Sequence, residues 1–289
     1  MSAVAGQEIR HVVGMSYLAN YAVVFHPPIV QVTSVVSLDE HERCWPLITN
    51  AASLPKIRCS LGKSTAFTPI LDTGLMDCLV LKRGLAEELL QSGEAVEVLK
   101  SGQIEPGNPA LLIIRELHVC GTIFSNVPAV IGTLDFVGFG ILRRMQLTLD
   151  FPNNRVIVPD PPQAGCDWFP IDASGIRIVR SEDRSIVIRR LVPQSNGENA
   201  GLHVGDKVLS VDGTQVEDLV CTEIRENLSQ AGKTVVLEIE RDGQRQKISV
   251  PLTHPFQYPP KWPPRKALTQ DQLDFQKFLE EQDQKSPNN

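Results

Sequence analysis

One short stretch, Thr68–Leu81, restricts the possible folds of this chain more than any other. In it the apolar run Pro69-Ile70-Leu71 leads into the polar tripeptide Asp72-Thr73-Gly74, and apolar residues resume at Leu79. A carboxylate between two apolar strands is costly to bury unless it is paired or hydrogen-bonded. Asp and Gly are also common in plain hairpin turns, because Asp bonds its own backbone and Gly accepts positive φ. The tripeptide alone therefore fits an ordinary turn or a functional one.

Composition limits the class of protein. The chain has 289 residues, of which 42% are hydrophobic and 21% charged, enough for two domains with packed cores. A net charge of −6 without a block of Lys and Arg gives no general attraction to nucleic acid or anionic membranes.

The sequence also bears on compartment and metals. We see no signal peptide and no run of about 18 apolar residues, so we expect no membrane span and a cytoplasmic location. The six cysteines form no CxxC pair and have no His at ligand spacing. We therefore predict a reducing environment, no metal and no cofactor.

Strands dominate the first half of the chain. Residues 1–45 contain two predicted strands, Tyr21–Phe25 and Ile29–Val36, whose role is unclear and which we expect to add to the domain that follows. Residues 46–160 alternate short strands with turns and have helical patterns at Gly84–Leu90 and Ile141–Met145. This predicts a mainly β domain with two short helices.

Residues 46–160 contain three sequence features whose order along the chain is informative. They are Asp72-Thr73-Gly74, the glycine-bearing reversal Ser101–Pro109, and Phe136-Val137-Gly138 followed by a helix and a hairpin. Together they resemble a retropepsin-like aspartic protease, a single-lobe relative of pepsin. The resemblance implies an acid-protease β-barrel in which an apolar-apolar-Gly element lies beside the catalytic turn. It implies catalytic roles for Asp72, Thr73 and Gly74, and substrate-binding roles for Ser101, Gly102, Phe136, Val137 and Gly138.

The implied chemistry needs two carboxylates facing one water. The chain has one Asp-Thr-Gly, and neither Asp135 nor Asp150 is followed by Ser/Thr-Gly, so we interpret both as turn or strand-end acids. We therefore expect a homodimer in which a second copy supplies the second carboxylate. In such a dimer Thr73 would brace the turn across the axis, and a protein or peptide substrate would lie under the 101–109 flap.

Residues 166–253 resemble a second family. The run Ala200–Val216 contains Ala-Gly-Leu, Gly-Asp and Val-Asp-Gly at spacings that resemble a PDZ domain of the bacterial type accompanying proteases. The resemblance implies a partly open β-barrel with helices, in which a loop before the first binding strand receives the C-terminal carboxylate of a peptide. The implied peptide-binding residues are Gly175, Ile176, Arg177 and Ile178, with Ile224 and Leu228 of a predicted helix Glu223–Gln230 on the other wall. The alternative is a domain that packs on its neighbour and binds nothing.

Residues 254–289 begin with a proline-rich linker, and the pattern of Ala267–Gln284 predicts a charged helix. We expect a spacer and a helix docked on the same protein or its dimer mate. Overall, the sequence predicts a dimeric aspartic endopeptidase with a peptide-binding PDZ domain. The alternative is a non-catalytic adaptor, because Leu75, Phe139-Gly140 and the flap without a double glycine depart from the protease pattern.

Overall fold

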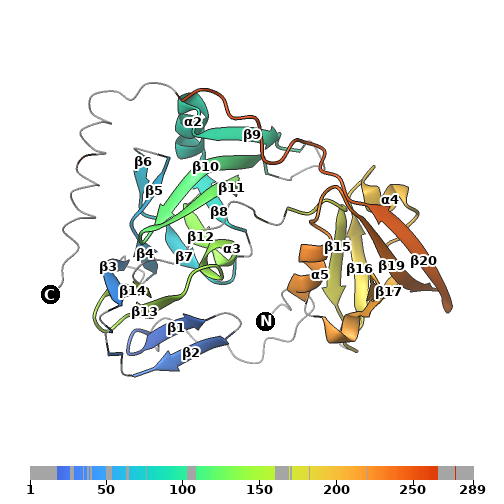
Figure 1. The fold of residues 1–289 in the computed structure, drawn as a ribbon, viewed down its shortest axis with the longest axis horizontal. Helices are drawn as coiled ribbons and strands as arrows, with labels where there is room; N and C mark the ends of the chain where they lie inside the picture. Colours follow the sequence, from blue (N-terminus) through green and yellow to red (C-terminus); the bar gives the residue numbers. More distant parts are fainter. Residues whose placement is uncertain are drawn as a thin grey trace. The chain divides into compact units, whose positions relative to one another are not determined.

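The computed structural model describes residues 18–26, 29–34, 36–37, 39, 41–49, 54–62, 65–75, 77–102, 109–159, 169, 171–181, 183–219, 221–265 and 277. They fall into two compact units. We call them the first unit, mainly residues 18–159 with 259–265, and the second unit, mainly residues 171–258 (Figure 1). Both units are built on β-sheets, which confirms the predicted mainly β fold class.

The first unit contains a sheet in the order β2-β1-β13-β14-β3-β4-β7-β12-β8-β11-β10-β5-β6, with β9 paired to β10. Its strands are β1 (Ala22–His26), β2 (Ile29–Thr33), β3 (Glu42–Thr49), β4 (Pro55–Ile57), β5 (Cys59–Leu61), β6 (Thr65–Phe67), β7 (Ile70–Asp72), β8 (Leu79–Lys82), β9 (Ala95–Leu99), β10 (Leu111–Val119), β11 (Thr122–Gly132), β12 (Phe136–Gly138), β13 (Leu147–Asp150) and β14 (Arg155–Pro159). Its helices are α2 (Arg83–Ser92) and α3 (Phe139–Leu142).

Local sequence explains the longer of these helices. The predicted helix at Gly84–Leu90 is confirmed as α2, which buries Ala86 and Leu89 against the sheet. Gly93 ends it with φ of 81° and donates its backbone N–H to the Leu89 carbonyl oxygen. This is the left-handed C-terminal cap that glycine forms most readily.

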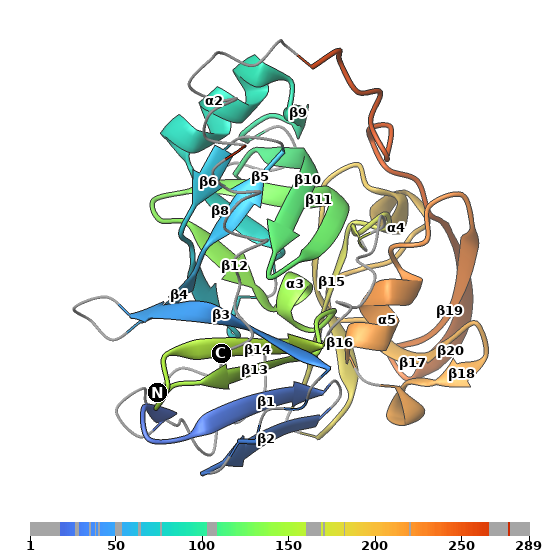
Figure 2. The ribbon, with the colours of Figure 1, turned by 60° about the vertical axis from the view of Figure 1, so that its left-hand side comes forward.

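The core of the first unit lies on the β10–β11 hairpin. These two long strands pair antiparallel from Leu111 opposite Val130 to Val119 opposite Thr122. Their inward side chains are fully buried, including Leu112, Ile114, Leu117, Phe124 and Val127. At the far end of the sheet, β1 pairs with β13 and places the early hairpin β1–β2 beside the β13–β14 hairpin (Figure 2).

The second unit is a separate antiparallel sheet in the order β15-β16-β17-β19-β20, with β18 paired to β17. Its elements are β15 (Ile176–Arg180), β16 (Ile186–Leu191), α4 (Asn196–Asn199), β17 (Lys207–Val211), β18 (Thr214–Gln215), the 3₁₀ turn η1 (Val216–Asp218), α5 (Cys221–Asn227), β19 (Thr234–Arg241) and β20 (Gln244–Pro251). The turns Asp212-Gly213 and Asp242-Gly243 have positive φ at both residues, as two-residue hairpin turns require.

Two predicted helices are displaced. The helix expected at Ile141–Met145 is α3, which starts at Phe139, and the one expected at Glu223–Gln230 is α5, which ends at Asn227. After both helices, backbone N–H groups donate to the carbonyl oxygen three residues earlier, as the Met145 N–H does to Leu142. Such tightened turns commonly satisfy helix ends.

The segment 259–265 returns to the first unit and docks there. The indole N–H of Trp262 donates to Asn126 Oδ1 (3.1 Å), and Arg265 Nε lies 2.9 Å from a carboxylate oxygen of Glu94. The expected spacer thus makes polar contacts with the first unit. The predicted helix 267–284 lies outside the described residues apart from residue 277.

Three smaller findings bear on the expectations from composition. Among the described residues no helix is long and apolar enough to span a membrane. None of the four cysteines whose side chains are described, Cys44, Cys59, Cys78 and Cys120, forms a disulfide. Burial raises the pKa of the Cys59 thiol well above its usual value.

Candidate active-site turn and peptide-binding strand

The Asp72 turn begins where β7 ends. Asp72 is partly exposed, and its Oδ1 accepts the backbone N–H of Gly74 at 2.8 Å. The Leu75 N–H donates to the Asp72 carbonyl oxygen at 3.3 Å, which closes the turn. Thr73 and Gly74 are exposed. Among the described residues, Oδ2 of Asp72 receives no hydrogen bond.

Strand β12 lies directly beside this turn. It runs parallel to β7, with Gly138 opposite Asp72, which confirms the adjacency that the resemblance implied. A Cβ added at Gly138 would lie 2.1 Å from the Asp77 carbonyl oxygen and 2.7 Å from that of Leu75. The chain leaving the turn therefore folds against Gly138 so closely that only glycine fits.

This packing corrects part of the expected substrate site. Val137 is completely buried in the core, and Gly138 is covered by the chain leaving the turn. Both residues therefore position the Asp72 turn and do not present a surface to substrate. Phe136 is partly buried. Gly140, one of the departures from the family pattern, has a packing reason, because an added Cβ would lie 2.7 Å from Cys78 Sγ.

Both other acids considered as catalytic partners are engaged elsewhere. Asp135 Oδ1 accepts the backbone N–H of Lys82 at 2.7 Å, and its Oδ2 lies 3.6 Å from Lys82 Nζ. Asp150 is 2% exposed and is held by Arg155 Nε at 2.6 Å and by Asn153. Their interpretation as turn or strand-end acids is confirmed.

Only the start of the predicted flap is described. Ser101 and Gly102 are exposed and form a turn after β9, whereas residues 103–108 lie outside the described part of the chain. Within the described residues no group of three or more His, Cys, Asp and Glu side chains could hold a metal.

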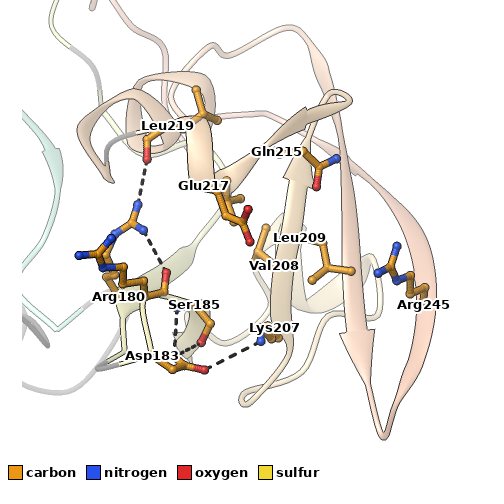
Figure 3. A pocket seen from close by; sticks show the side chains of 12 residues that line it. Arg180, Asp183, Ser185, Lys207, Val208, Leu209, Gln215, Glu217, Leu219 and Arg245 are labelled. Atoms are coloured by element: carbon orange, nitrogen blue, oxygen red, sulfur yellow. Dashed lines mark hydrogen bonds and ion pairs between the residues drawn. The ribbon is translucent and has the colours of Figure 1, made fainter.

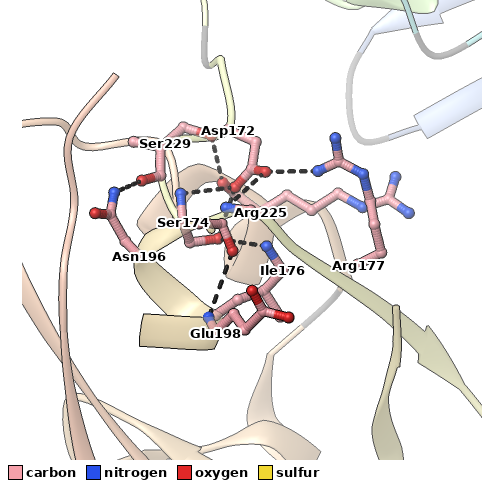
Figure 4. Close-up of polar contacts among 11 residues, drawn as sticks. Asp172, Ser174, Ile176, Arg177, Asn196, Glu198, Arg225 and Ser229 are labelled. Carbon is pink, nitrogen blue, oxygen red and sulfur yellow. Dashed lines mark hydrogen bonds and ion pairs between the residues drawn. The ribbon is translucent and has the colours of Figure 1, made fainter. Parts of the chain in front are cut away.

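In the second unit, β15 is an edge strand preceded by the expected carboxylate-binding loop. A carboxylate already occupies that loop (Figure 4). Asp172 Oδ1 accepts the N–H and the hydroxyl of Ser174 (3.0 and 2.7 Å), and Oδ2 accepts the Gly175 N–H (3.1 Å) and Arg177 Nη1 (2.6 Å). The Ile176 N–H donates to the Ser174 hydroxyl at 3.1 Å. Sequence reasoning missed Asp172, although an Asp two residues before a Ser is a typical signal for such a turn.

The expected groove residues divide by burial. The side chains of Ile176, Ile178, Ile224 and Leu228 are 1–5% exposed and belong to the core of the unit. In this structure they therefore support β15 and α5 from within. Arg177 is exposed and paired with Asp172. What β15 offers a ligand is its backbone edge.

The motif Gly205-Asp206 has a clear structural role. Asp206, with its side chain 1% exposed, receives Arg241 Nε and Nη2 at 2.7 Å each and the backbone N–H of His203 at 2.8 Å. Burial acts to raise the pKa of Asp206, but the hydrogen bonds and charge of Arg241 and the His203 N–H outweigh it, so the pKa lies below its usual value.

Comparison with known proteins defines the second unit. Residues 172–240 match the family model of the PDZ domain. This part of the chain is a PDZ domain, and peptide binding is the property that such a domain brings.

No curated protein matches the chain. A PDZ domain protein from Parabacteroides distasonis ATCC 8503 is 24% identical with a TM-score of 0.26, and the match covers 36% of this chain and 23% of that one. A retropepsin-like aspartic protease from Rickettsia conorii is 17% identical with a TM-score of 0.32, covering 43% and 96%. The photosystem II D1 C-terminal processing protease is 19% identical with a TM-score of 0.26, covering 29% and 24%. The chain spans about a quarter of the length of the first and third of these proteins.

Proposed function

We propose that this protein is an aspartic endopeptidase whose active site is completed by a second copy of the chain. The observation that carries the proposal is the Asp72 turn, which is held by its own backbone and by Gly138 and has one carboxylate oxygen without a hydrogen bond from any described residue. Because Asp135 and Asp150 are engaged elsewhere, the described part of one chain offers a single carboxylate suited to the reaction.

In the proposed dimer the two Asp72 carboxylates face one water. Two like charges about 3 Å apart cannot both ionise, so they titrate as a coupled pair. The ionised member takes a proton from the water, which attacks the peptide carbonyl. The protonated member donates to the carbonyl oxygen and stabilises the charge that develops there.

We further propose that the PDZ domain binds peptide C-termini by adding them as a strand to the edge of β15. A peptide whose terminal carboxylate lies at the loop before β15 must run antiparallel to that strand. Its carboxylate would compete with Asp172 for the N–H groups of Ser174 and Gly175. Arg177, which is paired with Asp172, would then pair with the peptide carboxylate.

Asp72→Asn tests the enzyme directly. We expect the full-length variant to dimerise as the wild type does and to lose at least about 100-fold in cleavage of a quenched fluorescent peptide library, because the dyad loses its ionisable pair. Asp77→Asn is the matched control, an exposed acid five residues further on, and should cleave at the wild-type rate. Wild-type cleavage by Asp72→Asn would refute the proposal.

A non-catalytic adaptor is the second candidate, and the single suitable carboxylate per chain favours it wherever the protein is monomeric. Analytical ultracentrifugation combined with a statine-type inhibitor separates the two functions. The enzyme is a dimer whose cleavage the inhibitor blocks. The adaptor binds C-terminal peptides and shows no hydrolysis at any pH.

A further inference from the structure

The PDZ domain carries a second polar site at the end of β15 remote from the carboxylate-binding loop. It is a pocket of about 720 Å³ lined by parts of β15, the β15–β16 turn, β17 and the segment before α5 (Figure 3). Its charged lining residues are Arg180, Asp183, Arg184, Lys207, Glu217 and Arg245. Four cations face two carboxylates, so the pocket is net positive in a chain of net charge −6.

The carboxylate of Asp183 is held by Ser185 and makes no close ion pair with the cations of the pocket. Its Oδ1 accepts the N–H and the hydroxyl of Ser185 (3.0 and 2.7 Å), and these bonds lower the pKa of Asp183. Its contact with Lys207 is long, at 3.9 Å. Arg184 has no ion pair among the described residues, and Arg245 approaches Glu238 only at 4.0 Å. Four cations against two ionised carboxylates leave a formal charge of +2, and among the described residues these cations have only long ion pairs.

Arg180 fixes the pocket to the peptide-binding edge. It is the last residue of β15, and its guanidinium donates to the Arg184 carbonyl oxygen (3.0 Å) and to the Leu219 carbonyl oxygen (2.8 Å) just before α5. Both partners are backbone carbonyls, and no carboxylate of a described residue lies within ion-pair distance. Arg180 therefore connects the end of β15 to the segment before α5, and its positive charge is not paired with a carboxylate of any described residue.

The length of β15 sets the register of a bound peptide. From Ile176 to Arg180 there are four steps of about 3.4 Å each, or about 14 Å. A peptide running antiparallel, with its last residue beside Ile176, places the residue four positions earlier beside Arg180. The two residues before that one reach the pocket.

We propose that this pocket selects acidic side chains at the fourth to sixth positions before the C-terminus of the bound peptide. The ligand class is a C-terminal peptide with an Asp- or Glu-rich segment just upstream of its last residues. This inference rests on the proposed C-terminal peptide binding by the PDZ domain. Because the whole chain is acidic, attraction of such a segment has to come from the pocket itself.

Three immobilised decapeptide libraries test the proposal, with the last four positions of each randomised. Positions four to six before the C-terminus, counting the last residue as zero, are all Glu in the first library and all Gln in the second. The third is the Glu library with an amidated C-terminus. We expect the full-length protein to bind the Glu library about three- to tenfold more tightly than the Gln library at 50 mM salt, and the preference to shrink at 500 mM salt. We expect amidation to abolish binding.

A charge-matched pair of variants locates the effect. The double variant Arg184→Gln/Lys207→Gln should lose the preference for Glu, whereas Arg189→Gln/Lys247→Gln, which removes the same charge from exposed positions outside the pocket, should keep it. Equal binding of the Glu and Gln libraries, with amidation still abolishing both, would overturn this inference alone. Binding that ignores amidation, or no binding to any library, would overturn the proposed C-terminal recognition as well.

Discussion

The Asp72 turn and the Asp172 loop use the same local chemistry to different ends. In each, an aspartate accepts backbone N–H groups two or three residues further along the chain. Asp72 accepts a single such bond, from Gly74. Asp172 accepts the two N–H groups and the hydroxyl of its loop and also pairs with Arg177. Among the described residues, the Asp72 carboxylate therefore accepts one hydrogen bond and the Asp172 carboxylate four.

Asp206 extends the comparison to a buried acid, because both its carboxylate oxygens accept hydrogen bonds and its side chain is only 1% exposed. Removing one partner of a buried pair leaves the other uncompensated, so we expect Asp206→Ala to lower the free energy of unfolding of the PDZ domain by about 3 kcal/mol. The exposed Asp218→Ala should change it by less than about 0.5 kcal/mol. Urea denaturation followed by circular dichroism measures both. Equal effects would show that burial and the pairing with Arg241 do not set the contribution of Asp206 to stability.

The contribution of Asp206 has a definite pH dependence. Its folded-state pKa is depressed, so its stabilisation is fully present above the unfolded pKa of about 3.9 and is lost as pH falls through the folded pKa. We expect the difference in stability between wild type and Asp206→Asn to be constant near neutral pH and to shrink below about pH 4. A difference that grows on acidification would contradict the pairing with Arg241.

Gly138→Ala disturbs the packing of β12 against the Asp72 turn. The new methyl group would lie 2.1 Å from the Asp77 carbonyl oxygen, so backbone must move. We expect a loss of about 2–3 kcal/mol in stability of the first unit. The control Gly84→Ala lies in α2 with nothing within 4 Å of the added Cβ and should be neutral or stabilising by up to about 1 kcal/mol. Thermal denaturation of the two variants separates steric support of the turn from a general glycine effect.

The parts of this molecule that follow from local sequence were predictable. The helix Arg83–Ser92 with its glycine cap and the Asp242-Gly243 hairpin depend on residues next to one another. The pairing of β12 with the Asp72 turn came from an ordered set of motifs. The burial of Val137 did not, because it depends on core packing from distant strands.

In the second unit, too, features set by neighbouring residues were predictable, whereas features set by residues far apart in the sequence were not. The sequence predicted a peptide-binding strand from Gly175 to Ile178, and β15 begins at Ile176, but the occupation of the loop by Asp172 depends on where Arg177 and the backbone point after folding. The basic pocket was beyond sequence reasoning for another reason. Arg180, Lys207 and Arg245 lie on three strands, and only the sheet brings them to one site.

Asp172→Asn reduces the number of strong hydrogen bonds at the Asp172 loop and so makes it more like the Asp72 turn. The amide oxygen can still accept a loop N–H, but the charge that faces Arg177 and opposes an incoming carboxylate is gone. Because Asp172 is partly exposed, we expect a loss of only about 1 kcal/mol in stability, and we expect C-terminal peptides to bind about threefold to fivefold more tightly.

Asp242→Asn is the matched control for Asp172→Asn, since it makes the same change in an exposed hairpin turn where Asn is equally suited to positive φ. Fluorescence polarisation with the amidated and free forms of one peptide reads the effect on the carboxylate itself. Tighter binding of the free form alone identifies Asp172 as a competitor for the peptide carboxylate. Weaker binding of the free form would instead mean that Asp172 organises the loop for its ligand. The four hydrogen bonds that Asp172 accepts would then be required for peptide recognition and would not oppose it.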